Sequence, residues 1–248
     1  MAVKPLGSVQ RALRVIEAIA ANQPIGLAEL CRVLDDDKSA LQRALVTLAD
    51  SGWIRPTGDQ VTRWEITEQP LVVAGQARRR SGLVTRLHPF IESIRDTTGE
   101  SVSVAVPDAG RIVTVDVVES PHLVRAAPRL GSILPTEASA AGLALFAHLD
   151  LAAVAEFLGA PVSAALRREI DRTRERGWSL NAGAVDASAT SLGAAVCDAT
   201  GRPQAAIVVS APSDRLTADR YDEVAAALLD ATDAAGDRDG HRPAMPRL

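Results

Sequence analysis

The sequence has little of what stabilises secreted proteins or anchors membrane proteins. Its two cysteines, Cys31 and Cys197, lie far apart in apolar surroundings without a C-x-x-C spacing. We expect both to be buried, unpaired thiols of a reducing compartment. No apolar run approaches the roughly 18 residues that span a bilayer. The start, MAVKPLGSVQ, lacks the apolar core of a signal peptide. The sequence therefore predicts a cytoplasmic protein without a membrane segment.

The common motifs of catalysis and nucleotide binding are also missing. The sequence contains no G-x-S-x-G, no G-x-x-x-x-G-K-[ST] and no G-x-G-x-x-G. Its four histidines, His88, His122, His148 and His241, lie far apart without the spacing of metal ligands. We therefore expect no enzymatic activity, no cofactor and no metal ion.

Length and charge place weak limits on function. With 248 residues, 47% of them hydrophobic, the chain is long enough for two modest domains. Residues 1–80 hold 11 Lys and Arg against 9 Asp and Glu, whereas residues 81–248 hold 16 against 22. The N-terminal part is thus slightly basic although the net charge is −4. Because phosphate affinity depends on local charge, this asymmetry alone is only mild support for nucleic-acid binding.

One stretch, DKSALQRALVTLAD at residues 37–50, indicates a helix that reads DNA. Leu41, Ala44, Leu45 and Leu48 fall at i, i+3, i+4 and i+7, which predicts one buried stripe. The opposite face carries donors and acceptors that can reach base edges, with a lysine for a phosphate at the first turn. These residues are Lys38, Ser39, Gln42, Arg43, Val46 and Thr47. An ordinary solvated helix has the same pattern, so the neighbouring segments decide between the two readings.

The segments before this stretch favour a helix-turn-helix. Ser8 is placed to cap a helix that runs to about Ala21, and we expect its apolar positions Val9, Leu13, Ile16 and Ala20 to be buried. A short helix is expected at 27–33, followed by a tight turn at 34–37. Two short helices joined by a tight turn, the second with a polar outer face, are typical of DNA-binding helix-turn-helix units.

A small hairpin is predicted after this unit. Residues 53–55 and 61–66 have the character of short strands around a turn at 56–60. Arg55 and Arg63 lie on these strands, where they could reach phosphates or a minor groove. The first 60 or so residues thus predict a winged helix.

At this point the sequence resembles the IclR-type transcriptional regulators of bacteria. The segments that carry the resemblance are SVQRALRVIEAIA, GLAELCRVL, DKSALQRALVTLADSGWI and TGESVSVAV, and the likeness extends to about Leu229. The resemblance implies an α+β protein with an N-terminal winged helix-turn-helix, a linker helix, and a C-terminal GAF-like effector-binding domain whose mixed sheet is flanked by helices. It also implies a homodimer or tetramer on palindromic, double-stranded operator DNA.

By this resemblance, Lys38, Ser39, Gln42 and Arg43 hold the DNA-contact positions of the family. The turn departs from the family pattern, because Asp35-Asp36-Asp37 replaces the usual glycine, apolar residue and proline. Carboxylates this close to phosphates repel them unless they point away or cap the helix.

We expect four segments along the chain. Residues 1–68 form the DNA-binding domain and 69–81 a linker helix, whose apolar side favours a dimer contact. Residues 82–236 form the effector-binding domain and 237–248 a flexible tail. The run Arg78-Arg79-Arg80 fits either contact with the DNA backbone or a solvated helix end.

The C-terminal part predicts a sheet with helices packed on it. Helices are expected at 84–97, 136–147, 151–158, 163–176 and 217–235. Strands are expected at 102–106, 112–118, 189–196 and 204–210, with an extended stretch at 123–134.

A ligand pocket is expected at the start of the small-residue helix in TEASAAGLAL. Ala140, Ala141 and Gly142 allow either a ligand to approach the helix backbone or close packing on the sheet. By resemblance, Ala140 and Ala141 match the family's effector-contacting segment, and its other pocket positions fall on Asn181, Ser191, Val208 and Ser210. Asn181 stands where an acid is common and Val208 where a serine can occur, so we expect a pocket that is less acidic and more apolar than the family's sites for small ketoacids. We therefore expect a larger effector, such as an aromatic acid or amide, held by hydrogen bonds from Ser191, Ser210 and Asn181.

The favoured hypothesis is a ligand-responsive transcription factor, most simply a repressor. Two alternatives belong to other classes. One is an enzyme with an appended winged helix, and the other is a protein-interaction module whose winged helix docks onto another protein.

Overall fold

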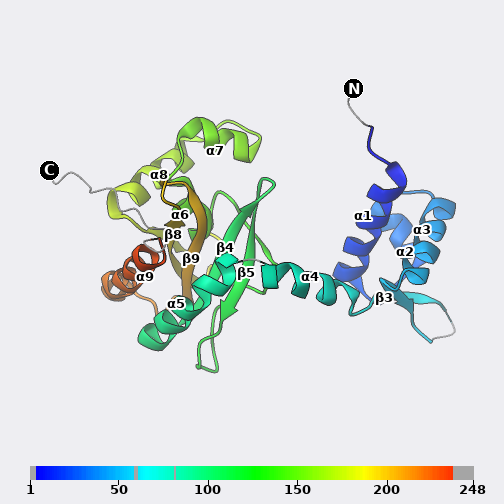
Figure 1. Ribbon diagram of the computed structural model, residues 1–248, viewed down its shortest axis with the longest axis horizontal. Helices are drawn as coiled ribbons and strands as arrows, with labels where there is room; N and C mark the ends of the chain where they lie inside the picture. Colours follow the sequence, from blue (N-terminus) through cyan, green and yellow to red (C-terminus); the bar gives the residue numbers. More distant parts are fainter. Residues whose placement is uncertain (1–3, 59–60, 81, 237–248) are drawn as a thin grey trace. The chain divides into compact units, whose positions relative to one another are not determined.

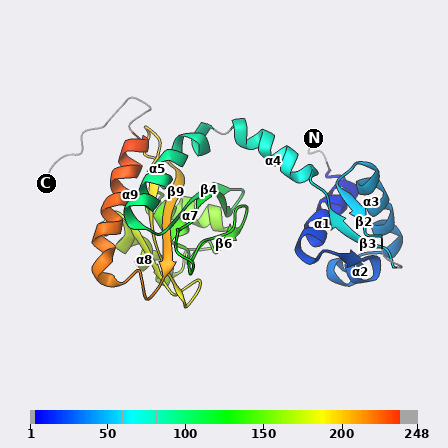
Figure 2. The same ribbon diagram turned by 90° about the horizontal axis from the view of Figure 1, so that it is seen from below.

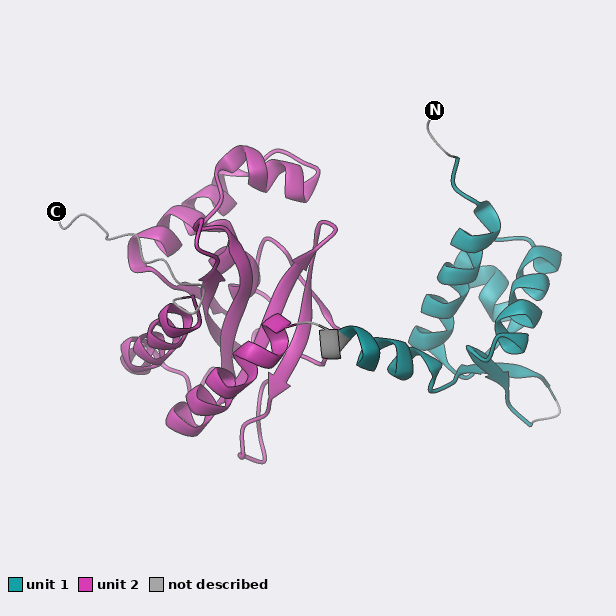
Figure 3. Cartoon of the chain, viewed as in Figure 1, with its two compact units in different colours: residues 1–81 teal, residues 82–248 magenta. Residues whose placement is uncertain are grey.

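The structure, a computed structural model, describes residues 4–58, 61–80 and 82–236, without the side chains of residues 78–80. The predicted tail at 237–248 and the side chains of the run Arg78-Arg79-Arg80 lie outside the described part. Residue contacts divide the chain into two compact units, residues 1–81 and residues 82–248 (Figures 1 and 3). In the described ranges, no helix is both long and apolar enough to cross a membrane.

The N-terminal unit is built on three helices, α1 (Gly7–Asn22), α2 (Leu27–Leu34) and α3 (Lys38–Asp50). Leu41, Leu45 and Leu48 of α3 are buried, as predicted from their spacing, and Ala44 packs against the same core at partial exposure. The apolar stripe therefore fixes which face of α3 remains free.

The prediction for the buried face of α1 was wrong. Val15 and Ile19 are fully buried, whereas Val9 and Leu13 are 53% and 55% exposed. Of the other expected positions, Ile16 is partly buried and Ala20 is exposed. Apolar residues occur at helical spacing on two faces of α1, and only the packing of α2 and α3 decides which face is covered. An apolar strip consequently remains exposed on α1.

A small antiparallel sheet completes this unit. The predicted hairpin is present as β2 (Ile54–Pro56) and β3 (Arg63–Ile66). A third strand, β1 (Ile25–Gly26), pairs with β3 and was not predicted, because two residues carry no alternation to detect. After the hairpin comes α4 (Gln69–Arg80), close to the predicted linker helix.

The C-terminal unit contains a six-stranded sheet in the order β6-β5-β4-β9-β8-β7. Its strands are β4 (Ser101–Asp108), β5 (Arg111–Val118), β6 (Ile133–Leu134), β7 (Ser179–Ala182), β8 (Ala189–Cys197) and β9 (Pro203–Pro212). Every pairing recorded in the described part is antiparallel, so the sheet is not mixed as expected. Only the last two residues of the expected stretch at 123–134 form a strand, and β7 was missed.

Helices cover both faces of this sheet. They are α5 (Gly82–Thr98), α6 (Ala140–Phe146), α7 (Leu151–Leu158), α8 (Ala164–Arg176) and α9 (Tyr221–Gly236), the last preceded by a 3₁₀ turn at Ala218–Arg220. On one face, α5 and α9 lie side by side (Figures 1 and 2) and pack against large aliphatic residues such as Val104 and Ile207. On the other, α6 packs against small residues such as Ala105 and Ala206.

The small-residue helix begins later than predicted. Ser139 caps α6 by accepting a hydrogen bond from the Gly142 amide at 3.2 Å, so residues 136–138 are outside the helix. A Cβ atom added at Gly142 would overlap the Thr136 carbonyl oxygen. Gly142 therefore allows the preceding turn to pass close to the helix, and it does not line the pocket described below.

A buried ion cluster joins the start of β4, an interior strand of the sheet, to two loops. Glu100, 1% exposed, accepts two hydrogen bonds from Arg215, Nε to Oε1 and Nη2 to Oε2, both at 2.6 Å. Arg220 adds a longer contact of 3.4 Å from Nη1 to Oε1. Arg215 also donates from Nη1 to the Val124 carbonyl at 2.9 Å. The cluster thus fixes the residue 124 segment to the start of β4.

Candidate functional site

The outer face of α3 collects the predicted DNA-contact residues. Lys38, Ser39, Gln42 and Arg43 are all exposed, on the side opposite the buried leucines. The same face includes Val46, which is 51% exposed and can contact a thymine methyl group. The structure therefore leaves this set free to meet a partner in solution.

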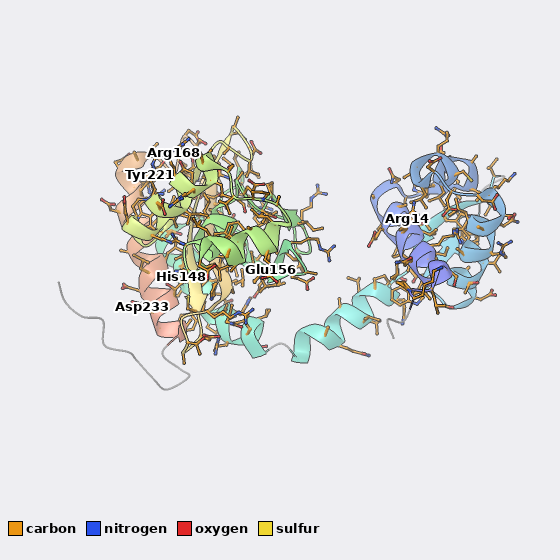
Figure 4. The ribbon with its side chains drawn as sticks, turned by 90° about the horizontal axis from the view of Figure 1, so that it is seen from above. Arg14, His148, Glu156, Arg168, Tyr221 and Asp233 are labelled. Carbon is orange, nitrogen blue, oxygen red and sulfur yellow. The ribbon has the colours of Figure 1, made fainter. Side chains whose placement is uncertain are left out.

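Two carboxylates of the acidic turn before α3 have partners within their own unit. Asp37 caps α3, because its Oδ1 accepts hydrogen bonds from the Ala40 amide at 2.9 Å and from Ser39 Oγ at 2.6 Å. Asp36 Oδ2 lies 2.8 Å from Arg11 Nε and 3.9 Å from Nη1 of Arg14, a residue of α1 (Figure 4). The hydrogen bond from Arg11 holds the pKa of Asp36 below its ordinary value, so this carboxylate stays charged and paired.

The third carboxylate of the turn, Asp35, ends α2 in the left-handed conformation with φ of 46°. Aspartate tolerates this region better than most residues, since its short side chain can hydrogen-bond locally. Asp37 thus caps the helix, as the sequence allowed, and Asp36 is paired with arginines, whereas Asp35 and Asp37 remain exposed carboxylates.

The two arginines of the wing are held by carboxylates. Arg55 Nε lies 2.7 Å from Glu65 Oε1, and its Nη1 lies 3.3 Å from Glu68 Oε2. Arg63 donates to Glu29 Oε2 at 2.7 Å and to the Pro24 carbonyl at 3.0 Å. A phosphate would have to compete with these partners.

A pocket of about 480 Å³ opens in the C-terminal unit between the sheet, the start of α6 and the loop at 124–128. It brings together every residue predicted for the effector site. These are Ala140, Ala141, Asn181, Ser191, Val208 and Ser210. Residues from four separate chain segments thus meet around one cavity.

Strand register places polar groups in a row on the pocket floor. Ser210 of β9 pairs with Ser191 of β8, and Ser191 pairs with Asn181 of β7. The two serine hydroxyl oxygens lie 2.8 Å apart. Asn181 Oδ1 accepts from the Ala184 amide at 2.9 Å. Its Nδ2 has no recorded acceptor within the described ranges, so this group remains a donor for a ligand.

The residues that line the pocket include only two charged ones, Arg125 and Asp186. Arg125 is paired with Glu119, 2.6 Å from Nη2 to Oε2. Ser188 donates from both its hydroxyl and its amide to Asp186, and these hydrogen bonds lower the pKa of the carboxylate. The interior is therefore lined by hydroxyl, amide and small apolar groups, which suit a ligand held by hydrogen bonds.

Sequence reasoning missed part of the pocket. Ser103 of β4, the 124–128 loop and Asp186 line it but were not predicted. For Ser103 a signal existed, because in VSVAV a small polar residue alternates with valines and so must face the side opposite the aliphatic core. The loop carries no comparable pattern.

Metal and thiol chemistry receive no support from the described residues. Among them, no group of three or more His, Cys, Asp or Glu is placed to hold a metal ion. Burial raises the pKa of the Cys197 thiol to about 11, so it stays protonated at neutral pH. Burial also lowers the pKa of His148, which follows α6 (Figure 4).

Comparison with known protein families finds two matches. The family described as "Bacterial transcriptional regulator IclR C-terminal" matches residues 76–236, and the "IclR helix-turn-helix domain" matches residues 8–58.

Individual proteins agree with these matches. The chain is 29% identical to the transcriptional repressor IclR of Escherichia coli, covering 90% of this chain and 86% of that protein. It is 26% identical to the acetate operon repressor of Salmonella typhimurium, with the same coverage. A crystal structure of an IclR homologue from Microbacterium hydrocarbonoxydans, complexed with 4-hydroxybenzoate, has a TM-score of 0.76 at 19% identity and covers 92% of this chain and 97% of that one.

Proposed function

The chain belongs to the IclR family of bacterial transcriptional regulators, and we propose that it is a repressor whose affinity for operator DNA is controlled by a small molecule. Its relatives are regulators rather than enzymes, and several are repressors. The observation that carries the proposal is the pocket, which gathers all six expected effector positions in one cavity. We assign DNA binding to residues 1–68, the linker to 69–81, effector binding to 82–236 and a tail to 237–248. The protein would act in the cytoplasm, where the DNA is.

For DNA, we propose that α3 enters the major groove. Gln42 and Arg43 would read base edges, while Lys38 and Ser39 would contact the backbone. Arg55 and Arg63 of the wing would add phosphate contacts after exchanging their carboxylate partners for DNA. This assignment predicts that the loss of Arg43 and the loss of Lys38, both on α3, affect DNA binding in different ways.

Replacing Arg43 by alanine should weaken operator binding by roughly 1–3 kcal/mol and relax base preference at one position of each half-site, if it pairs with a guanine. Lys38→Ala should instead weaken specific and random DNA alike and reduce the salt dependence by about one phosphate contact. Titration of labelled upstream DNA and of a scrambled duplex at several salt concentrations measures both effects.

The exposed Arg168 on α8 (Figure 4) provides a control, and Arg168→Ala should leave binding unchanged. Equal losses on specific and random DNA for Arg43→Ala would show that this residue contacts phosphate only. If the unmodified protein binds no DNA in a salt-sensitive manner, the winged helix docks onto a protein instead.

Self-association of two chains would supply two copies of α3, one for each half-site of the operator. Leu71, Val72 and Val73 of α4 are 73%, 51% and 44% exposed, and Val9 and Leu13 form the uncovered strip on α1. Contiguous exposed apolar residues of this kind mark protein interfaces. We propose that they pair two copies, as a homodimer or within a tetramer, on a palindromic operator.

For the effector, we propose an aromatic acid or amide. The volume of about 480 Å³ lies within the usual range for small-molecule sites, and the floor offers hydrogen-bond donors rather than fixed charge. The Microbacterium homologue, of the same fold, holds 4-hydroxybenzoate. An effector that prefers one arrangement of the linker helices would shift operator affinity by its differential affinity for the two states.

Calorimetry against a panel of small carboxylates tests the effector class. We expect aromatic acids or amides to bind more tightly than glyoxylate and pyruvate, because a small ketoacid leaves much of the cavity unfilled. Tighter binding of either ketoacid than of every aromatic compound in the panel would overturn this proposal.

A further inference from the structure

Another cavity, of about 250 Å³, lies between α6 and α7, and we call it the α6–α7 cavity. The proposed effector pocket borders Ala140 and Ala141 at the start of α6, whereas this cavity borders Leu145 and Phe146 at the end of the same helix. No residue that lines one of the two is recorded as lining the other within the described ranges. The α6–α7 cavity is therefore a separate place for a ligand.

Four segments that are distant in the sequence form the walls of this cavity, namely the tip of the β4–β5 hairpin, the end of α6, α7 and the turn before β9. The hairpin tip packs closely on α7 at Gly110, which has φ of 77°. A Cβ atom there would lie 3.1 Å from the Phe157 carbonyl oxygen, so glycine permits the close approach. The rings of Phe146 and Phe157 meet edge to face, with their centroids 5.6 Å apart. These contacts join the hairpin, α6 and α7, so the cavity is preformed.

The lining of the α6–α7 cavity is apolar except at one point. Its small or apolar residues are Pro107, Ala109, Gly110, Leu145, Phe146, Leu149, Phe157 and Pro203. Arg202, in the turn between β8 and β9, is the charged residue among the described ones at the wall. Its side chain is exposed to solvent, which places the cation at the opening. An apolar interior with a positive charge at its opening suits a compact apolar molecule that carries one anionic group.

The guanidinium of Arg202 is not occupied by the nearby acidic residue. Asp198 is engaged by its own turn, because its Oδ1 accepts hydrogen bonds from the Thr200 hydroxyl at 2.6 Å and from the Arg202 amide at 3.1 Å. Its Oδ2 accepts from Gln204 Nε2 at 2.9 Å. In the part of the chain that the structure describes, no ion pair or side-chain hydrogen bond of Arg202 is recorded. A guanidinium in this position is a recognition group for a carboxylate, which it binds with charge-assisted hydrogen bonds.

We propose that the α6–α7 cavity binds a compact apolar monocarboxylate, such as a short branched aliphatic acid, and that Arg202 holds its carboxylate. The aliphatic chain contacts Leu145, Leu149 and Phe157. The volume of about 250 Å³ lies just below the usual range for ligand sites, about 300–1,000 Å³, and so selects a short chain. This site goes beyond the proposed effector pocket, and neither assignment depends on the other.

The test compares 4-methylpentanoate with its neutral analogue 4-methylpentanamide by calorimetry on the full chain. The unmodified protein should bind the acid about five- to tenfold more tightly than the amide, as expected for one charge-assisted pair at an exposed arginine. Arg202→Gln should weaken the acid about five- to tenfold and leave the amide within about twofold, which removes the preference. Because Arg202 is exposed, the variant should fold as the unmodified protein does.

Arg111→Gln is the matched control, because Arg111 is exposed on the same hairpin but does not line the cavity. It should keep the preference for the acid. A third variant, Asn181→Ala, alters the proposed effector pocket and should bind the acid as the unmodified protein does. If Asn181→Ala loses the acid while Arg202→Gln retains it, the acid occupies the effector pocket and the present proposal is wrong. An equal loss of acid and amide in Arg202→Gln, or no binding of the acid to the unmodified protein, also overturns it while the proposed function stands.

Discussion

Replacing Arg215 by alanine is expected to lower the free energy of unfolding of the C-terminal unit by roughly 3–5 kcal/mol. The substitution leaves the buried carboxylate of Glu100 without its main partner. Glu100 is 1% exposed and loses both 2.6 Å hydrogen bonds, while Arg220 remains only at 3.4 Å. A buried carboxylate without its partner bears the full cost of lost hydration. The Val124 carbonyl loses its donor as well, so the pocket loop should loosen.

Urea denaturation measures this effect. In a Trp53→Phe, Trp64→Phe background, the fluorescence of Trp178 reports on the C-terminal unit alone, since the other two tryptophans lie in the N-terminal unit. Arg168→Ala, an exposed arginine in the same unit, should change stability by no more than about 0.5 kcal/mol. Removing both partners of the cluster should cost less than the sum of the single changes. A loss below about 1 kcal/mol for Arg215→Ala would mean that Arg220 or water replaces it.

Gly142→Ala is the second substitution with a large expected effect. The added methyl group would overlap the Thr136 carbonyl oxygen, which belongs to the backbone and cannot rotate away as a side chain does. Overpacking of this kind falls at the upper end of its usual range, about 3 kcal/mol. We expect the strain to displace the start of α6, so that effector affinity falls together with stability.

Gly82→Ala provides the comparison within the same unit. Gly82 opens α5, and a Cβ atom there would meet no atom within 4 Å. Alanine is the better helix former, so this change should be neutral or slightly stabilising. The same denaturation experiment reports both variants. If Gly142→Ala is as stable as Gly82→Ala, the turn at Thr136 moves freely and the close approach has no energetic role.

The helices of the N-terminal unit show when the spacing of apolar residues predicts the buried face of a helix. The stripe of Leu41, Leu45 and Leu48 predicted the buried side of α3 correctly, because the helix carries only one apolar face. In α1 the same reasoning selected Val9 and Leu13, which are exposed, because that helix carries two. Spacing identifies an apolar face, but only the neighbouring helices determine whether that face is covered.

The sheet shows a related limit. Its long strands were predicted from their β-branched residues, whereas β7, with the sequence SLNA, has no such signal and forms because β8 offers an edge. The relative direction of paired strands could not be predicted from the sequence either. A mixed sheet was expected, whereas the recorded pairings of the described strands are antiparallel. These features depend on contacts between distant segments, which local propensity does not describe.

The candidate site also contains residues that were predicted and residues that were not. Its six expected positions came from the family resemblance, and the cavity contains all of them. The alternation in VSVAV indicates the face on which Ser103 lies, but its position beside Val208 depends on the register between β4 and β9, whose residues are about a hundred positions apart in the chain. The acidic turn could not be interpreted from sequence either, since Arg11 and Asp36 meet only after α1 and α2 have packed.

The two faces of the C-terminal sheet differ in how freely their residues can be exchanged over evolutionary time. Neighbouring residues of β4 serve different ends, since Val102 and Val104 belong to the aliphatic core whereas Ser103 borders the cavity. A single exchange at Ser103 or Ser210 changes the lining of the cavity, which we propose to be the effector site, while the layer beneath α5 and α9 keeps its composition. Under the proposed function, a response to a different effector therefore requires only point mutations that leave the architecture intact.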